Sequence, residues 1–175
     1  LYPVVDFPIN VTEKETKYSP KELIYSIIRQ ESEFSSEAVS YSGAIGMMQI
    51  MPDTAKMLSR QEKLKYDLNK VLEDSSYNVQ LGSRYIFDLV KEFDGSYIRA
   101  ISSYNAGPNR IKQWNKNNTT DNVLDWIELI PFKETRYYVK NVLRNVQFYR
   151  ILLNIEDNKF NILDDLERGT ASEDS

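Results

Sequence analysis

The fold can be read from one short stretch, SPKELIYSIIRQES at residues 19–32. Its first residues form a capping-box pattern, with Ser19 at the N-cap, Pro20 at the first helical position and Glu22 at the third. Apolar residues then recur at the three- and four-residue spacing of a helix with one buried face. The stretch therefore predicts an amphipathic helix that ends near Glu31.

Glu31 is the unusual residue of this helix, because it falls within the apolar stripe. At about 100° per residue, Glu22 and Glu33 project toward solvent, whereas Glu31 lies on the buried side between Ile24 and Ile27. Burial disfavours the charged form of a carboxyl group, and the negative end of the helix dipole acts in the same direction. We therefore expect a raised pKa, as a general acid near neutral pH requires. The alternative is a structural carboxylate that caps a neighbouring helix or pairs with one of the 22 Lys and Arg residues.

Two further motifs add small, polar and flexible residues. GAIGMMQIMP at residues 43–52 combines glycines that permit close backbone approach with methionines and with Gln49, whose amide both donates and accepts hydrogen bonds. SYNAGP at residues 103–108 ends a helix and places Tyr104 and Asn105 just before that end. A purely structural alternative exists for each motif. The first can be a turn followed by core methionines, and the second an ordinary helix terminus. Beside a single buried acid they suit acid catalysis on a glycosidic bond.

Four motifs follow one another along the chain: RQES (29–32), GMMQIMP (46–52), SYNAGP (103–108) and IPFKETRYYVKNV (130–142). In this order they resemble the soluble lytic transglycosylases, a family with a lysozyme-like catalytic domain. The resemblance runs from about Pro20 to Leu153, which is most of the chain. Met47 stands where the family usually has Leu, and Ser103 where it usually has Ala; neither difference affects the chemistry.

By this resemblance, Glu31 is the sole catalytic acid and base, and the partner is the peptidoglycan glycan strand. The acid would cleave the β-1,4 bond between N-acetylmuramic acid and N-acetylglucosamine and leave a 1,6-anhydromuramoyl end. Arg136 is expected to pair within the fold, while Asn105 and Glu134 have structural roles as alternatives. The positions that the resemblance places near the sugar subsites are Ser40, Gln49, Met51, Tyr104, Asn105, Glu134 and Tyr138.

Three other functions stay open from the residues alone. A lysozyme-type inverting hydrolase would need a second carboxylate about 6.5–9.5 Å from the acid to activate water, and a distant Asp or Glu could supply it. A non-catalytic glycan-binding module would keep the groove but would have no need of an acid on an apolar face. A helical interaction protein without a sugar site is the last alternative.

Composition excludes several classes of site. The chain has no His and no Cys, so it contains no Ser-His-Asp relay, thiolate nucleophile, disulfide or His-ligated zinc, and we expect neither metal nor cofactor. The formal net charge is -4, and residues 155–175 carry -5 through seven acids and two bases. The remainder is nearly neutral at +1, without the basic footprint of a nucleic-acid-binding protein.

The pattern predicts a mainly α fold, which the resemblance makes a lysozyme-like single helical domain with a substrate groove at residues 18–154. Residues 1–17 are expected to form an extended arm that docks on this domain and continues from a helical N-terminal module, as in related proteins. Residues 155–175 are expected to be an acidic, partly disordered tail with solvated charges. No apolar run is long enough to span a membrane, and the resemblance implies action in the periplasm.

Helical periodicity extends over most of the remaining chain. A short hairpin around residues 36–48 is the one place where strand pairing is considered. Beyond the first helix and the one that opens at Pro52, helices are expected at about 75–93, 96–105, 109–115, 123–130 and 133–153.

Overall fold

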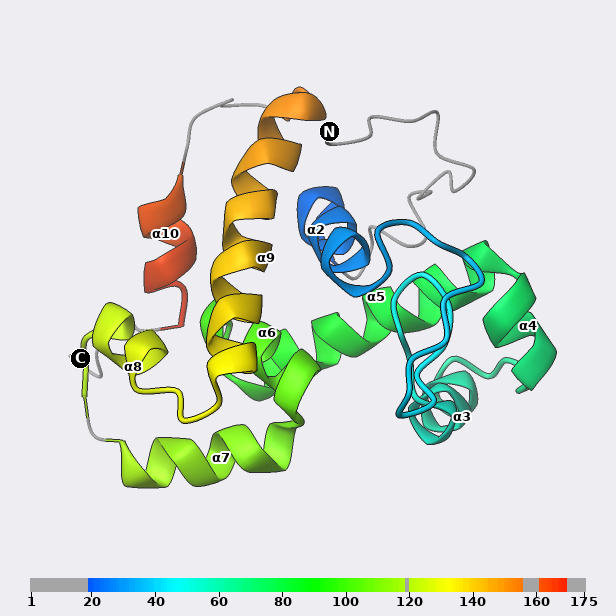
Figure 1. Cartoon of the computed structure of the whole chain (residues 1–175), viewed down its shortest axis with the longest axis horizontal. Helices are drawn as coiled ribbons and strands as arrows, with labels where there is room; N and C mark the ends of the chain where they lie inside the picture. Colours follow the sequence, from blue (N-terminus) through cyan, green and yellow to red (C-terminus); the bar gives the residue numbers. More distant parts are fainter. Residues whose placement is uncertain (1–18, 119, 156–160, 170–175) are drawn as a thin grey trace.

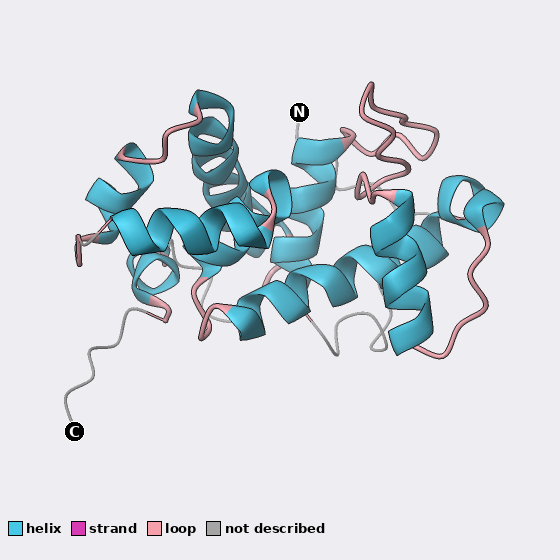
Figure 2. Cartoon of the chain, turned by 90° about the horizontal axis from the view of Figure 1, so that it is seen from below, coloured by secondary structure: helices cyan, strands magenta, loops and turns pink. Residues whose placement is uncertain are grey.

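Helices form the secondary structure of the described chain, as predicted. The computed structural model describes residues 19–118, 120–155 and 161–169. Figure 1 shows the order of the helices, and Figure 2 shows that loops connect them in this part of the chain. None of the described helices is long and apolar enough to cross a bilayer. The helices are α2 (Lys21–Glu31), α3 (Pro52–Gln61), α4 (Leu68–Glu73), α5 (Ser75–Glu92), α6 (Tyr97–Ala106), α7 (Pro108–Asn117), α8 (Val123–Glu128), α9 (Lys133–Leu152) and α10 (Ile162–Glu167).

The helix predicted at residues 19–32 is α2, and it packs against α9. These two helices lie side by side in Figure 1 and have the most extensive contact of any described helix pair. Burying one large aliphatic side chain contributes about 1.5–3 kcal/mol, so this seam is a major part of the core. Its fully buried residues include Leu23, Ile24, Ile27 and Ile28 of α2, and Val139, Val142 and Val146 of α9.

A buried asparagine holds the loop between α2 and α3 against α5. Asn78 accepts a hydrogen bond from the Met48 N–H at 2.9 Å. Its amide donates to the carbonyl oxygens of Ile45 and Val71, at 3.0 and 2.9 Å. Gly46 lies at φ +75, and a Cβ at that position would come within 2.2 Å of the Asn78 amide nitrogen. The glycine of the GMMQI motif is therefore required for the loop to approach α5.

The predicted start of α2 is wrong in two respects. Ser19 does not cap the helix: α2 begins after Pro20 without a capping side chain, and Ser19 Oγ donates instead to the Ser83 carbonyl oxygen at 3.3 Å. Glu22, expected to face solvent, is 8% exposed and forms an ion pair with Arg150 of α9 at 3.7 Å. Periodicity within one helix could not reveal this burial, because the partner of Glu22 comes from another helix.

Short elements also differ from the prediction. The hairpin expected around residues 36–48 is limited to isolated bridges, between Val39 and Ile45 and between Ile45 and Ile50. Gly107, at φ +87, ends α6 as expected, and Pro108 directly opens α7, one residue before the expected start at 109. The six-residue helices α4 and α10 were not predicted, since they are too short to show a clear period.

The predicted division of the chain stays a prediction, because the arm at residues 1–17 lies outside the described residues. The C-terminal segment is described at residues 161–169, where α10 packs against α6, α8 and α9. Asp165 of α10 is only 1% exposed, because Arg150 and Gln147 of α9 bind its carboxylate. The expectation of solvated charge is therefore wrong for Asp165.

We expect Asn78→Ala to lower the free energy of unfolding by about 3 kcal/mol, because it removes three buried hydrogen bonds and leaves backbone groups unpaired. Thermal and urea unfolding followed by circular dichroism would measure the loss. Asn109→Ala, at an exposed position of α7, is the matched control and should change stability by no more than about 0.5 kcal/mol. Equal effects of the two substitutions would show that Asn78 does not hold the loop.

Candidate active site

Glu31 is the last residue of α2, and its carboxyl group meets a phenol from α9. The Tyr138 hydroxyl donates a hydrogen bond to Glu31 Oε1 at 2.5 Å. Tyr138 is buried and Glu31 is half-buried. The two residues lie 107 positions apart in the chain, so the contact depends entirely on the packing of α2 against α9.

The pKa of Glu31 is raised from its ordinary 4.5 to about 7. Burial is the largest cause, since it disfavours the charged carboxylate. The hydrogen bond from Tyr138 stabilises the carboxylate and lowers the pKa, while the negative charge of Glu134 raises it. The predicted direction and the predicted role of burial are confirmed. Near neutral pH, a substantial share of the molecules carries the protonated acid.

Tyr104 of α6 is a second phenol at this place. Its hydroxyl donates to the Met48 carbonyl oxygen at 2.9 Å, and its ring centroid lies 5.2 Å from that of Tyr85. Burial first, and the charge of Glu31 second, raise the pKa of both Tyr104 and Tyr138 well above the ordinary phenol value. Both side chains are therefore neutral near pH 7 and remain hydrogen-bond donors.

The end of α2 is tied to the loop that follows it. Ser32 Oγ donates to the Met47 carbonyl oxygen at 2.8 Å. The neighbouring carbonyl group, that of Met48, accepts the hydrogen bond from Tyr104 of α6. The end of α2 and α6 therefore each bind one carbonyl group of the GMMQI motif. This role of Ser32 was not predicted, and its place directly after Glu31 is the signal that could have indicated it.

Three predicted subsite residues lie in this loop, and two of them organise it. Gln49 Nε2 donates to the carbonyl oxygens of Ala38 and Gly46, both at 2.9 Å. Ser40 Oγ accepts a backbone hydrogen bond across a turn at 2.9 Å. Met51, directly before α3, is exposed. A role in sugar binding stays a prediction for all three.

The remaining predicted residues lie near the start of α9. Asn105 Oδ1 accepts a hydrogen bond from Thr135 Oγ1 at 2.7 Å and so joins the end of α6 to α9, which fits the structural alternative. Glu134 is exposed in the first turn of α9. Arg136 donates to the Ile130 carbonyl oxygen at 2.9 Å, so the expected pairing within the fold is confirmed. The buried Thr135 was not predicted, because a threonine in a charged stretch has no distinctive sequence signal.

The arrangement can donate and accept a proton at one carboxyl group. Oε1 of Glu31 accepts a hydrogen bond from the neutral Tyr138 hydroxyl. The other carboxyl oxygen is therefore the one that can exchange a proton with a ligand. Over the described residues, no group of three or more acidic side chains is placed to hold a metal ion.

Comparisons with known proteins match nearly all of the region that contains these residues. A family model described as "Transglycosylase SLT domain" matches residues 9–127, and one described as "Soluble lytic transglycosylase helical domain" matches residues 129–157. The chain is 33% identical over 154 residues to the soluble lytic murein transglycosylase of Escherichia coli K12, covering 84% of this chain and 24% of that protein. The chain thus spans about a quarter of the length of this relative.

Solved structures show the same similarity in three dimensions. The 70-kDa soluble lytic transglycosylase from Escherichia coli matches with a TM-score of 0.80 and 31% identity, covering 89% of this chain and 26% of that one. An inactive glutamate-to-glutamine mutant of the lytic transglycosylase Slt from Pseudomonas aeruginosa matches with a TM-score of 0.76 and 38% identity, covering 81% and 23%. The predicted lysozyme-like helical fold is confirmed.

We expect Tyr138→Phe to raise the pKa of Glu31 above its value of about 7, because the substitution removes a hydrogen bond that stabilises the carboxylate. An NMR titration of carbon-13-labelled glutamate carboxyl groups would measure the change. Tyr137→Phe, at the exposed neighbouring tyrosine of α9, should leave the titration of Glu31 unchanged. An unchanged or lower pKa in Tyr138→Phe would contradict the role assigned to this hydrogen bond.

Proposed function

The chain belongs to the soluble lytic transglycosylase family, and from that premise we propose that it cleaves the β-1,4 bond between N-acetylmuramic acid and N-acetylglucosamine in peptidoglycan. The bond is broken without water, by closing a 1,6-anhydro ring on the muramoyl residue. The observation that supports the proposal is the Glu31 carboxyl group at the position of the family motif. Its pKa is about 7, and it accepts a hydrogen bond from the Tyr138 hydroxyl.

Glu31 acts first as the general acid. Because the Tyr138 hydroxyl occupies Oε1, the acid proton is on Oε2, the oxygen left for the substrate. Transfer of this proton to the bridging oxygen breaks the glycosidic bond, and positive charge develops at the muramoyl anomeric carbon. The new carboxylate and the N-acetyl group of the substrate stabilise that charge.

The same residue then acts as the base. The Glu31 carboxylate takes the proton of the muramoyl 6-hydroxyl, whose oxygen bonds to the anomeric carbon. One C–O bond is broken, one is formed, and the proton returns to Glu31. Tyr138 stabilises the carboxylate between the two steps. A pKa of about 7 suits both steps, because one group must donate and accept a proton at the same pH.

A lysozyme-type hydrolase is the second candidate, and one observation favours it. The charge of Glu134 raises the pKa of Glu31, so a second carboxylate lies within electrostatic reach of the acid. In an inverting hydrolase such a carboxylate activates water at about 6.5–9.5 Å from the acid. We favour transglycosylation, because the relatives that match are named transglycosylases and because one carboxyl group suffices for it.

The sugar subsites would lie along the loop after α2 and the ends of α6 and α9. Tyr104 and Tyr138 adjoin Glu31, and the exposed side chain of Met51 offers a flexible apolar contact. Since peptidoglycan lies outside the cytoplasmic membrane, the enzyme would act in the periplasm. The residues proposed to bind substrate are Ser40, Gln49, Met51, Tyr104, Asn105, Glu134 and Tyr138.

Mass spectrometry of muropeptides released from purified peptidoglycan tests this proposal. The wild-type chain should release products lighter by one water than their reducing-end counterparts. Glu31→Gln should lower the rate by at least about 100-fold, because it removes the only proton donor and acceptor of the mechanism. Glu33→Gln, which changes an exposed glutamate two positions away, should retain the wild-type products.

Other products would identify other functions. Reducing-end products would mean hydrolysis, and their loss in Glu134→Gln would assign the water-activating base. Absence of cleavage together with saturable binding of chitooligosaccharides would support a glycan-binding module and overturn the proposal.

We also expect kcat/KM to be nearly constant at low pH and to fall as the pH rises through about 7, because the protonated fraction of Glu31 declines there. The initial rate of peptidoglycan solubilisation, measured across the pH range at low substrate, gives this profile. A fall centred near 4.5, the ordinary value for Glu, would show that the buried carboxyl group is not the acid of the rate-determining step.

A further inference from the structure

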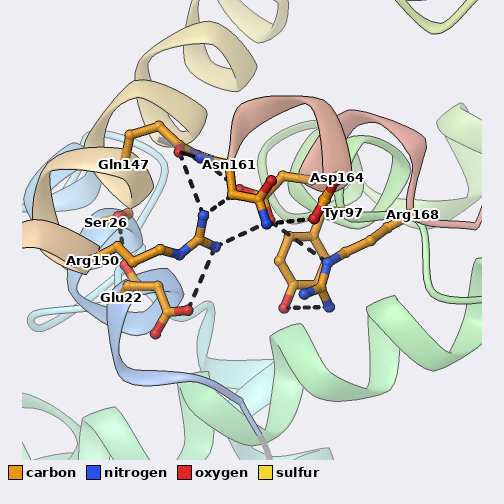
Figure 3. Close-up of polar contacts among 9 residues, drawn as sticks. Glu22, Ser26, Tyr97, Gln147, Arg150, Asn161, Asp164 and Arg168 are labelled. Atoms are coloured by element: carbon orange, nitrogen blue, oxygen red, sulfur yellow. Dashed lines mark hydrogen bonds and ion pairs between the residues drawn. The ribbon is translucent and has the colours of Figure 1, made fainter. Parts of the chain in front are cut away.

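Arg150 lies near the opposite end of α9 from Tyr138, and it joins three helices. Its guanidinium makes a two-bond contact with the carboxylate of Asp165 on α10, with both N···O distances at 3.1 Å. The same guanidinium forms an ion pair with Glu22 of α2 at 3.7 Å. Figure 3 shows Arg150 reaching from α9 between Glu22 on one side and the residues of α10 on the other.

The Arg150 cluster, defined as Glu22, Gln147, Arg150, Asp165 and Arg168, is largely buried and balanced in charge. Arg168 Nε lies 3.6 Å from Asp165 Oδ1, so two cations face two carboxylates. Gln147 Nε2 donates to Asp165 Oδ2 at 2.7 Å. A buried charge that loses its partner is costly, so the geometry of this cluster is strongly constrained.

The residues at the end of α10 also contact α6. The Arg168 guanidinium lies 4.6 Å from the centroid of the Tyr97 ring and donates to the Tyr97 hydroxyl at 3.4 Å. Gly169, at φ +70, lies so close to the start of α6 that a Cβ there would be 2.4 Å from the Ser96 nitrogen. The described end of the chain is therefore a fixed support for Asp165.

The cluster acts on the same two helices that form the proposed catalytic pair. Arg150 is twelve residues from Tyr138 on α9, or about 18 Å, and Glu22 is nine residues from Glu31 on α2, or about 13 Å. The apolar contacts between these ends restrict the register of the two helices through the fit of their side chains, but the hydrophobic effect itself is non-directional. The two-bond contact with Asp165 is directional and holds the Arg150 guanidinium in one orientation on α10. In that orientation the guanidinium lies 3.7 Å from the Glu22 carboxylate, and this ion pair is the charged link from α9 to α2.

We infer that Arg150 is a positioning residue for the proposed reaction: its contacts with Glu22 and Asp165 fix the register of α9 on α2, and through it the hydrogen bond between Tyr138 and Glu31. The catalytic part of this inference rests on the proposed function. Its geometric part does not, because the Tyr138 hydrogen bond can be followed without turnover.

The test compares two disruptive variants with one control in the full chain. Asp165→Asn removes the carboxylate from the two-bond contact. Arg168→Met, at a half-exposed residue, leaves that contact in place but removes the second ion pair of Asp165 and the contacts with Tyr97, so it loosens the support of Asp165 with less risk to folding. The control is Glu62→Gln, which breaks the ion pair between Glu62 and Arg84. The Glu62 side chain is 11% exposed, as is that of Glu22, but its pair does not join α2 to α9.

The readouts are the NMR titration of Glu31 and the separate values of kcat and KM. A shifted register weakens the hydrogen bond that lowers the pKa of Glu31, so Glu31 should titrate at higher pH in Asp165→Asn and, to a smaller extent, in Arg168→Met. Measured well below that pKa, kcat of Asp165→Asn should fall at least about tenfold while KM changes less than about twofold. Glu62→Gln should change neither the titration nor kcat, whatever its melting temperature.

If both disruptive variants lower thermal stability but leave the titration and kcat at control values, Arg150 has only a structural role and the inference is wrong. Arg168→Met decides the question if Asp165→Asn does not fold. A wild-type chain that releases no anhydro products would overturn the proposed function alone, since the titration still tests the link between Arg150 and Glu31.

Discussion

The packing of α2 against α9 is the interaction on which the rest of the structure depends. It brings Glu31 and Tyr138 together across 107 residues of sequence and supplies the burial that raises the pKa of the acid. The loop after α2 takes its position from the same unit, because Ser32 binds it at the end of α2. One helix pair therefore forms a major part of the core and creates the environment of the proposed catalytic group.

This environment has a cost in stability. A pKa raised from 4.5 to about 7 corresponds to about 3 kcal/mol in favour of the neutral carboxyl group. Because the folded-state pKa lies above the unfolded value, the free energy of unfolding falls as the pH rises from about 4.5 to about 7, and the loss is complete above that range. The fully buried aliphatic residues of the seam offset it, at about 1.5–3 kcal/mol each. The tight packing of α2 against α9 therefore compensates for the unfavourable burial of the Glu31 carboxylate.

Sequence patterns predicted the parts of this arrangement that are encoded within one helix. The apolar period of α2 indicated the burial of Glu31 and the direction of its pKa shift. The resemblance added Tyr138 to the site, but not its bond to Glu31. Contacts between helices could not be predicted from these patterns. Glu22 was assigned to solvent from the period of α2, because its partner Arg150 lies 128 positions away in the sequence. Asp165 was assigned to solvent because it lies in an acidic run, and such runs are usually solvated.

Three of the proposed sugar-binding side chains, Gln49, Tyr104 and Tyr138, use their hydrogens inside the protein, and this restricts what they can bind. Both hydrogens of Gln49 Nε2 go to backbone carbonyl oxygens, the Tyr104 hydroxyl donates to another, and the Tyr138 hydroxyl donates to Glu31. These groups therefore present acceptor lone pairs to a ligand. The hydroxyl and N-acetyl N–H groups of a glycan strand are matching donors, whereas a carboxylate-rich ligand would meet acceptors at all three side chains. Since the acceptors are fixed by internal bonds before binding, a sugar that donates to them requires no rearrangement of the site.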